Sequence, residues 1–295
     1  MTIRHAVALL LAASTLQAET AVQRLLEDKL LFGRVKAIGD AIHGALGVAT
    51  IDLTSGRVFV YNGEAEFPTA STIKVPLMVE LFRRTESGEL RLDSPVTVSP
   101  SDLVEGSDPT KARLASGPAA IALADLMRAM IEQSDNTATN KLIAIAGMDR
   151  VNRLLASQNM RATRMRRRMI DVAAAARDEE NTTSPLEMAR FLETLFRGGL
   201  ADADATKQMI GLMKLVKADI RAAIPAQIEV ASKPGDLPGV HCEIAIVYLP
   251  DRPFILSVYS SFLNDDENPV PDVAKAAFEY FKKLAASNRY GNRVR

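Results

Sequence analysis

Residues 67–74 read Phe-Pro-Thr-Ala-Ser-Thr-Ile-Lys, so that Ser71 stands three positions before Lys74 at the start of a helical run. Residues three apart lie on one face of a helix, and the lysine side chain can therefore reach the serine hydroxyl. Free N–H groups at a helix N-terminus favour negative charge, and a serine becomes a good nucleophile only when a base takes its proton. The stretch predicts a serine nucleophile with a lysine base. Taken alone, the stretch would favour a helix N-cap followed by a solvated lysine.

A second polar motif, Ser134-Asp135-Asn136, lies between two apolar-periodic runs, residues 123–131 and 138–143. This pattern predicts a helix–helix junction. At such a junction Ser134 could pass a proton between a lysine and a leaving group, and Asn136 could hold Lys74 or a substrate amide. The simpler interpretation is that Asp135 or Asn136 caps the second helix, and capping is compatible with catalysis by Ser134.

The third motif, Lys233-Pro234-Gly235, ends a strand-like run, residues 228–232. A strand beside the nucleophile can supply a cation and a backbone N–H group for an oxyanion. Proline is tolerated in a strand where its missing N–H is not needed, which is typically at a sheet edge. A lone Pro-Gly favours a turn, but the order of the three motifs favours a substrate-binding edge strand.

Working outward from these motifs, hydrophobic periodicity separates strands at the two chain ends from helices in the middle. Helices are expected over 21–42, over most of 71–213 and over 269–286, and strands over 46–53, 57–61, 228–232, 243–249 and 254–261. The pattern predicts an α+β fold of the α/β-sandwich type: an antiparallel sheet from both chain ends, flanked by terminal helices, with an inserted all-helical lobe. We expect one catalytic domain, 19–295, with an α/β lobe (19–66 and 214–295), a helical lobe (67–213) and a substrate cleft between them.

The bulk composition narrows the class of protein. The 295 residues carry 36 basic and 36 acidic side chains, and this balance argues against a nucleic-acid-binding protein. No apolar run is long enough to span a bilayer. We expect a monomer that acts on a small molecule, with no nucleic-acid partner.

The N-terminus has the pattern of an export signal. Arg4 and His5 precede an apolar stretch, residues 6–13, and Leu16-Gln17-Ala18 offers a cleavage site. The sequence predicts a signal peptide over 1–18 and a periplasmic or secreted protein, and the alternative is an ordinary buried helix. Cys242 is the only cysteine, which rules out an internal disulfide. Its apolar surroundings predict a buried, inert thiol.

Two other kinds of catalytic site find no support. The histidines outside the predicted signal, His43 and His241, accompany no Gly-x-Ser-x-Gly motif, which argues against a Ser-His-Asp triad. No His-Glu-x-x-His motif, cysteine pair or carboxylate cluster suggests a metal. We therefore expect no metal and no cofactor.

The three motifs together resemble those of the class A serine β-lactamase family and related penicillin-recognising serine hydrolases. The resemblance covers about residues 21–287 and extends to the segments 67–74, 101–105, 132–138, 178–185 and 220–225. It implies that Ser71 is the acylated nucleophile, Lys74 its base and Ser134 the proton shuttle. It also implies that Lys233 holds a substrate carboxylate and that the N–H groups of Ser71 and Asp236 form the oxyanion hole.

The chain departs from this family at two positions. The family's Ω-loop glutamate, which activates the deacylating water, has no counterpart, and Asp171 is the one acidic residue of the segment 166–173. Pro234 replaces the hydroxyl residue that usually helps to bind the β-lactam carboxylate. Both departures predict slow penicillin turnover with acylation intact. Asp171 is either a relocated base or the partner of a neighbouring arginine that orders the loop.

Five arginines gather in residues 161–168. They could form a membrane or nucleic-acid patch, but the acidic run 178–180 nearby favours a solvated or internally paired loop.

Three functions remain open on the sequence. The first is a β-lactamase that hydrolyses a β-lactam amide through an acyl-enzyme on Ser71, slowly because the usual glutamate is absent. The second is a D-alanyl-D-alanine peptidase or an esterase of the same fold. The third is a penicillin-binding or sensing protein that is acylated without turnover.

Overall fold

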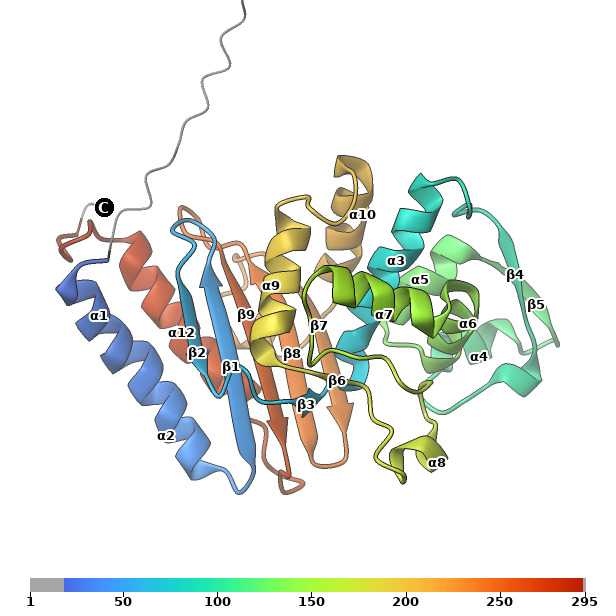
Figure 1. Cartoon of the computed structure of the whole chain (residues 1–295), viewed down its shortest axis with the longest axis horizontal. Helices are drawn as coiled ribbons and strands as arrows, with labels where there is room; N and C mark the ends of the chain where they lie inside the picture. Colours follow the sequence, from blue (N-terminus) through green and yellow to red (C-terminus); the bar gives the residue numbers. More distant parts are fainter. Residues whose placement is uncertain (1–18, 294–295) are drawn as a thin grey trace, which may run out of the picture.

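The computed structural model describes residues 19–293, so the predicted signal peptide lies outside the described residues. Its centre is a five-stranded antiparallel sheet with the strand order β2-β1-β9-β8-β7 (Figure 1). The strands are β1 Ala45–Asp52, β2 Val58–Tyr61, β7 Val230–Leu237, β8 Val240–Val247 and β9 Phe254–Ser261. Strand β1 pairs along its whole length with β9, from Ala45↔Ser261 to Asp52↔Phe254. The prediction of one antiparallel sheet built from both chain ends is confirmed.

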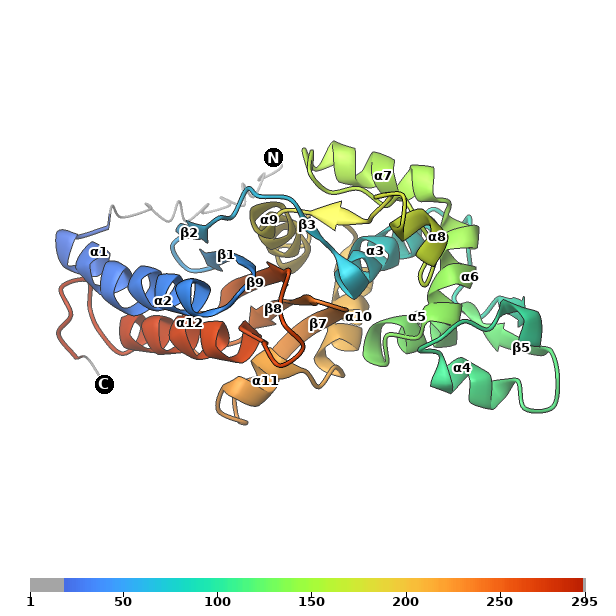
Figure 2. The same ribbon diagram turned by 90° about the horizontal axis from the view of Figure 1, so that it is seen from below.

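Helices cover both faces of this sheet, and every residue of β9 is buried as a result. Figure 2 shows the sheet between α9, Pro185–Phe196, on one side and α12, Val270–Ala285, with α2, Gly33–Ala41, on the other. The core between β9 and α12 includes stacked rings of Phe254 and Phe281, whose centroids lie 4.1 Å apart. Because helices cover both faces of the sheet, the sequences of these strands are nearly continuous apolar runs rather than alternating apolar and polar residues.

The helix predicted over residues 21–42 is present as one continuous helical segment. Helix α1, Ala21–Glu27, passes through a π turn, Asp28–Phe32, into α2. Thr20 begins it with a capping box, since its side chain accepts from Gln23 N while the Gln23 side chain accepts from Thr20 N. The segment packs beside α12 (Figure 1).

The middle of the chain is helical, as predicted, around the buried helix α3, Lys74–Glu86. The other helices are α4 Asp108–Arg113, α5 Leu123–Glu132, α6 Asn136–Ala146, α7 Met148–Ser157, α8 Val172–Ala175, α10 Ala203–Lys214 and α11 Asp219–Ala223. Two small strand pairs that the sequence did not reveal join them: β3 Phe67–Pro68 with β6 Thr182–Thr183, and β4 Pro95–Val98 with β5 Ala119–Ala122. Helices α9 and α10 also pack on the sheet, and thereby connect the helical part to it.

One strand boundary differs from the prediction. The run 228–232 was expected to end before Lys233-Pro234-Gly235, but β7 continues through this motif to Leu237 and stays in register with β8. Proline usually stops a strand because it has no N–H group to donate. Here β7 is the edge of the sheet, as predicted. Pro234 removes no hydrogen bond to β8, because its main-chain groups face the free edge.

Among residues 19–293, no helix is long and apolar enough to cross a membrane.

Candidate active site

Ser71 lies in a tight turn between the sheet and the central helix. Residues 70–73 form a 3₁₀ turn, Ala70–Ile73, and the α-helix proper begins at Lys74. Ala70 has a φ of +41°, a conformation that non-glycine residues rarely adopt and that often marks a functional site. The predicted helix start at Ser71 is therefore one 3₁₀ turn in front of α3, and Ser71 keeps its place near the N-terminal end of that helix.

Gly235 of β7 packs directly against the nucleophile. A Cβ atom added to Gly235 would lie 2.6 Å from Ser71 N and 3.0 Å from Cys242 Sγ. The approach to the Ser71 main chain is closer than real Cβ atoms make, and the approach to Cys242 is tighter than most, so glycine is the residue that fits between the strand and the turn. This contact places the Lys233-Pro234-Gly235 motif directly beside Ser71.

Lys74 is completely buried, and its ammonium group uses three acceptors. Nζ donates to Ser134 O (2.8 Å), Ser134 Oγ (3.0 Å) and Asn136 Oδ1 (2.8 Å). Burial, followed by the nearby Lys233 cation, lowers the pKa of Lys74 well below its usual value. A lysine that loses its proton more readily can act as a general base near neutral pH.

Lys233, on β7, reaches the same hydroxyl from the opposite side. Its Nζ donates to Ser134 Oγ (2.9 Å) and to Pro234 O (3.0 Å). Burial lowers the pKa of Lys233 to about 8. Ser134, with a φ of +56°, therefore presents its hydroxyl between two lysines. The structure brings Lys74, Ser134, Asn136 and Lys233 together, as the motifs predicted, although the hydrogen bonds of Lys74 go to the second motif rather than to Ser71 Oγ.

The junction that carries Ser134 is held by Asp135 and Asn136. Asp135 caps α6, because its Oδ1 accepts from Ala138 N (2.8 Å). Its Oδ2 accepts from Thr110 N of α4 (2.9 Å), which joins the two helices. Asn136 Nδ2 donates to Glu105 O (2.9 Å), and this bond turns Oδ1 toward Lys74. The capping interpretation is therefore confirmed for Asp135, and it is compatible with a catalytic role for Ser134.

The free edge of β7 faces away from β8 at Pro234 and Asp236. Tyr248 N donates to Glu229 O (2.9 Å) just before β7, so the main-chain groups of Glu229 face β8. Because these groups alternate in direction along a strand, those of Lys233 and Gly235 also face β8, and those of Pro234 and Asp236 face outward. Pro234 therefore costs the ladder no hydrogen bond. The N–H group of Asp236 is left free at the edge, next to the Gly235 contact with Ser71 N.

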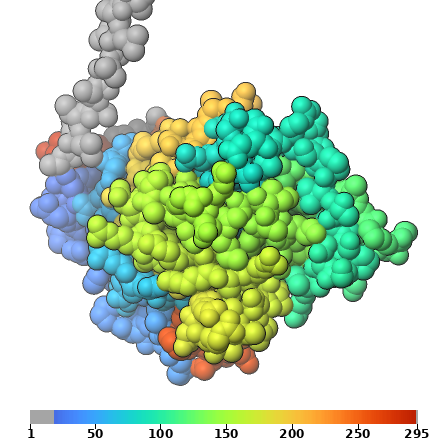
Figure 3. Space-filling model, turned by 45° about the vertical axis from the view of Figure 1, so that its right-hand side comes forward, coloured from blue at the N-terminus to red at the C-terminus, as the bar shows by residue number. Residues whose placement is uncertain are grey.

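Asp171 lies in the loop of residues 165–181, which we call the Ω-loop and which Figure 3 shows in yellow-green and yellow on the surface. Its Oδ1 accepts from Ala174 N (3.0 Å) and caps the short helix α8. Among residues 19–293, Asp171 forms no direct ion pair with a neighbouring arginine, and its carboxylate orders the loop by capping the helical turn that follows it. Met169 of this loop lies against α6, where it bonds to Asn140.

Asn140 holds Met169 on both sides. Asn140 Oδ1 accepts from Met169 N (2.8 Å), and Asn140 Nδ2 donates to Met169 O (3.1 Å). Asn140 stands four residues after Asn136, on the same face of α6. The Met169 side chain is buried in the helical core. The Ω-loop thus presents a thioether, rather than a carboxylate, next to the helix that carries Asn136.

The arginine-rich stretch is partly solvated and partly paired, in line with the expected solvated or internally paired loop: Arg161, Arg166 and Arg168 are exposed. Arg167 is buried and forms a two-point pair with Glu180, from Nε to Oε1 (2.9 Å) and from Nη2 to Oε2 (2.8 Å). Arg166 donates to Glu180 O (3.0 Å) and to Thr182 Oγ1 (2.7 Å). These bonds tie the two ends of the Ω-loop together.

Cys242 is buried, as predicted, beneath the nucleophile turn. Its Sγ donates to Gly235 O (3.0 Å). Burial raises the pKa of the thiol well above its usual value, and a protonated thiol is a poor nucleophile.

Sequence reasoning missed three residues of this region. Gly235 belonged to the third motif but was given no role of its own, Asn140 was not singled out, and His241 was named only as a histidine outside any triad motif. His241 lies directly opposite Asp236 on β8, and its Nδ1 lies 2.7 Å from Asp236 Oδ1. The one available signal was the Pro238-Gly239 pair, which marks the hairpin turn and fixes which residues face each other.

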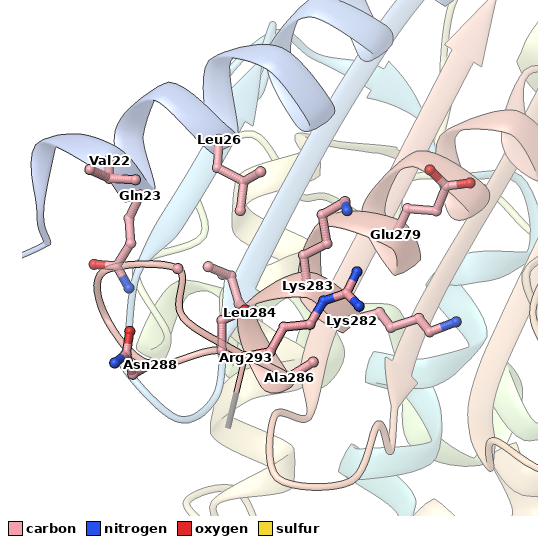
Figure 4. A pocket seen from close by; sticks show the side chains of 12 residues that line it. Val22, Gln23, Leu26, Glu279, Lys282, Lys283, Leu284, Ala286, Asn288 and Arg293 are labelled. Carbon is pink, nitrogen blue, oxygen red and sulfur yellow. The ribbon is translucent and has the colours of Figure 1, made fainter. Parts of the chain in front are cut away.

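A separate hollow of about 740 Å³ lies between α1, α12 and the C-terminal segment (Figure 4). Its lining combines apolar Leu26 and Leu284 with Lys282, Lys283 and Arg293. It shares no residue with the three motifs and is therefore distinct from the catalytic cluster. Across the described part of the chain, no group of three His, Cys, Asp or Glu side chains could hold a metal ion.

Comparison with known proteins agrees with this geometry. The profile of a family described as "Beta-lactamase enzyme family" matches residues 31–281. A β-lactamase of Proteus vulgaris is 31% identical over 247 residues, which cover 81% of this chain and 90% of that protein. The β-lactamase Toho-1 of Escherichia coli is 30% identical over 267 residues and 88% of each chain.

Solved structures show the same relationship. An ancestral class A β-lactamase superposes with a TM-score of 0.77 and 31% identity, and covers 87% of this chain and 100% of its own. A β-lactamase from Xanthomonas campestris pv. campestris superposes with a TM-score of 0.79 and 27% identity, over 88% of this chain and 98% of its own. The fold prediction is confirmed, and the chain belongs to the class A serine β-lactamase family.

Proposed function

We propose that this protein hydrolyses a β-lactam amide through an acyl-enzyme on Ser71. The observation that carries the proposal is the shared acceptor: Ser134 Oγ receives hydrogen bonds from both Lys74 and Lys233. Two buried amines around one hydroxyl form a route for a proton from the nucleophile to a leaving group. The named relatives, all β-lactamases, support the choice of a β-lactam as substrate.

In the first step the neutral Lys74 amine takes the proton of the Ser71 hydroxyl, and Ser71 Oγ attacks the lactam carbonyl carbon. The carbonyl oxygen becomes negatively charged between the N–H groups of Ser71 and Asp236, which costs no reorganisation because both groups are fixed beforehand. Gly235 keeps these two N–H groups close to each other.

In the second step the C–N bond of the ring breaks. Ser134 gives its proton to the lactam nitrogen and recovers one from Lys74, whose Nζ lies 3.0 Å away. Lys233 stabilises the Ser134 oxygen during this exchange through its own 2.9 Å hydrogen bond. The ester on Ser71 remains, and Lys74 returns to its neutral form.

Deacylation is the slow step in this proposal. A water molecule that attacks the ester needs a base within hydrogen-bond reach. On the Ω-loop, Met169 offers no base, and the Asp171 carboxylate is bonded to Ala174 N. We therefore propose a long-lived acyl-enzyme and slow hydrolysis. Asp171 would support the reaction by keeping the Ω-loop ordered rather than by acting as a base.

Substrate binding rests on the edge of β7. Lys233 uses two of its three N–H groups within the protein, at Ser134 Oγ and Pro234 O, and the third can meet a substrate carboxylate. Pro234 supplies a carbonyl but no hydroxyl, so the carboxylate loses one hydrogen bond. Asn136 would hold Lys74 and contact the substrate amide.

The proposed place of action is outside the cytoplasmic membrane. The basic Arg4 and the apolar stretch 6–13 support export with cleavage after Ala18. N-terminal sequencing of the protein collected outside the cytoplasm should then begin near Glu19.

The test of the function is a time course of intact mass after mixing with a penicillin. Ring opening adds the whole penicillin, so the expected adduct has the full mass of the antibiotic, on a Ser71 peptide. The adduct should then disappear slowly while penicilloic acid accumulates. The Ser71→Ala variant is the control and should form no adduct. A wild-type protein that forms neither adduct nor product would overturn the proposal, and a permanent adduct would favour penicillin binding without turnover.

A further inference from the structure

The side chain of Asp236 introduces a negative charge at the place where the substrate should lie. Gly235 packs on Ser71 N, and adjacent Cα atoms are about 3.8 Å apart, so Asp236 follows the nucleophile contact immediately. Its main chain faces the free edge of β7. A residue whose N–H group points into the substrate site carries its own carboxylate within a few ångströms of that site.

Among the described residues, the Asp236 carboxylate pairs with His241 and forms no ion pair with a lysine or an arginine. Asp236 Oδ1 lies 2.7 Å from His241 Nδ1, across the β7–β8 pair. Its side chain remains 65% exposed, so it faces the solvent from which a substrate arrives. The main chain of His241 is fixed in turn, because its carbonyl accepts from Ser260 Oγ (2.6 Å).

Lys233 is the cation at the edge of β7 that can bind a substrate, and the Asp236 carboxylate raises its pKa. Burial lowers the pKa of Lys233, and the Asp236 carboxylate is one of the negative groups that oppose this effect. The same carboxylate must repel an anion that approaches Lys233. Pro234, between the two residues, has no hydroxyl group to compensate.

We propose that Asp236 sets the charge selectivity of the cleft: it disfavours acyl donors that carry a carboxylate beside the reacting amide, relative to acyl donors that are uncharged there. The inference rests on the proposed acylation of Ser71 and deepens it. Compared with a neutral residue at position 236, Asp236 shifts the preference of the cleft toward a lactam or ester whose leaving-group side bears no negative charge. Two charges about 8 Å apart near a protein surface change binding by about 30-fold without salt, and screening over about 10 Å at 0.1 M reduces this to about fivefold.

The test compares a penicillin with its methyl ester, in which a methyl group removes the negative charge of the carboxyl group. The rate of Ser71 acylation is measured for both by intact mass, and the ratio of acid to ester is the readout. A change in the oxyanion N–H group of Asp236 affects both compounds alike and cancels in the ratio. In Asp236→Asn, the ratio should rise by about fivefold, and the rise should shrink in 1 M salt.

Asp28→Asn is the matched control. Asp28 is an exposed aspartate in the π turn on the far side of the sheet, so its loss changes the net charge equally but should leave the ratio unchanged. An unchanged ratio in Asp236→Asn, with both compounds still acylating Ser71, would overturn this inference alone. Failure of both compounds to acylate the wild-type protein would overturn the proposed function, and the inference with it.

Discussion

Lys74 and Lys233 direct their ammonium groups at one atom, Ser134 Oγ, at 3.0 and 2.9 Å. Among the described residues, neither lysine forms an ion pair with a carboxylate. Two buried cations so close together destabilise each other, and a lowered pKa relieves the repulsion. The Lys233 cation is accordingly the second cause, after burial, of the lowered pKa of Lys74. Proximity of the two lysines therefore makes one of them a base while the other remains a cation.

This division of roles predicts a bell-shaped pH profile for acylation. The rate should rise with pH as Lys74 loses its proton, and the rise should be complete well below the usual lysine pKa. Above about pH 8 the rate with an anionic β-lactam should fall, because Lys233 loses its charge at its own pKa of about 8. In Lys233→Arg, the guanidinium stays charged and the alkaline limb should move beyond pH 10. Acylation rates by intact mass from pH 5 to 10 check this, and an unmoved limb would assign it to another group.

Gly235→Ala should impair both stability and acylation. The new Cβ would come within 2.6 Å of Ser71 N, so either β7 or the nucleophile turn must move. Overpacking of this kind costs about 1–3 kcal/mol, and a shift of the two oxyanion N–H groups should slow acylation by about 10²-fold. Urea unfolding and the acylation rate are the measurements. Gly211→Ala is the control, since a Cβ there meets nothing within 4 Å.

Glu243, on β8 opposite Pro234, should make the protein less stable as the pH rises. Burial raises the pKa of this carboxyl group to about 7, and one of its oxygens has no hydrogen-bond partner. The folded state therefore binds its proton more tightly than the unfolded state, so stability is fully present below about pH 4.5 and is lost as the pH rises through about 7.

The variant Glu243→Gln removes this charge and can still accept from Ile220 N, the present partner of Glu243 Oε2. The difference in the free energy of unfolding between this variant and wild type should change by about 1–3 kcal/mol in favour of the variant as the pH rises from 5 to 8. Urea unfolding at both pH values checks the difference. An equal free-energy gap at the two pH values would show that Glu243 does not titrate in this range.

Much of this fold could be predicted from local patterns, and the failures share a physical cause. The strands near residues 46–53 and 254–261 follow from apolar runs, and the three motifs identified the catalytic cluster. The continuation of β7 past Pro234 could not be predicted, because it depends on which side of the strand lacks a neighbour. The Asp236–His241 pair and the Asn140–Met169 bonds depend on register and on loop placement. Neither leaves a periodic signal in the sequence.

Asp171 should affect the order of the Ω-loop and leave deacylation unchanged. Asparagine caps a helix about as well as aspartate, so Asp171→Asn should keep the 3.0 Å bond to Ala174 N and the wild-type deacylation rate. Asp171→Ala removes the cap and should destabilise the loop by about 1 kcal/mol, which proteolysis of the loop would detect. A large drop in deacylation in a folded Asp171→Asn protein would instead make Asp171 the general base.

Met169→Glu should shorten the life of the acyl-enzyme. Asn140 fixes the backbone of residue 169 by two hydrogen bonds, so a new side chain there starts from a defined place beside α6, one turn from Asn136. Glutamate has nearly the length of methionine and would bring a carboxylate to the part of the site that lacks a base. General bases contribute about 10²–10⁴-fold, and even imperfect placement should speed deacylation at least tenfold.

Met169→Glu should also lower the stability of the protein, and a second variant separates this packing effect from the effect of the new base on deacylation. The Met169 side chain is 7% exposed and belongs to the helical core, so a carboxylate there should destabilise the protein by about 1–3 kcal/mol. Met169→Gln has the same shape without the charge. It should lose similar packing in urea unfolding but leave deacylation slow, because an amide cannot take a proton from water. If Met169→Gln speeds deacylation as much as Met169→Glu, the loop has merely opened to solvent. If Met169→Glu folds and its acyl-enzyme persists as in wild type, residue 169 does not face the ester, and slow turnover has another origin.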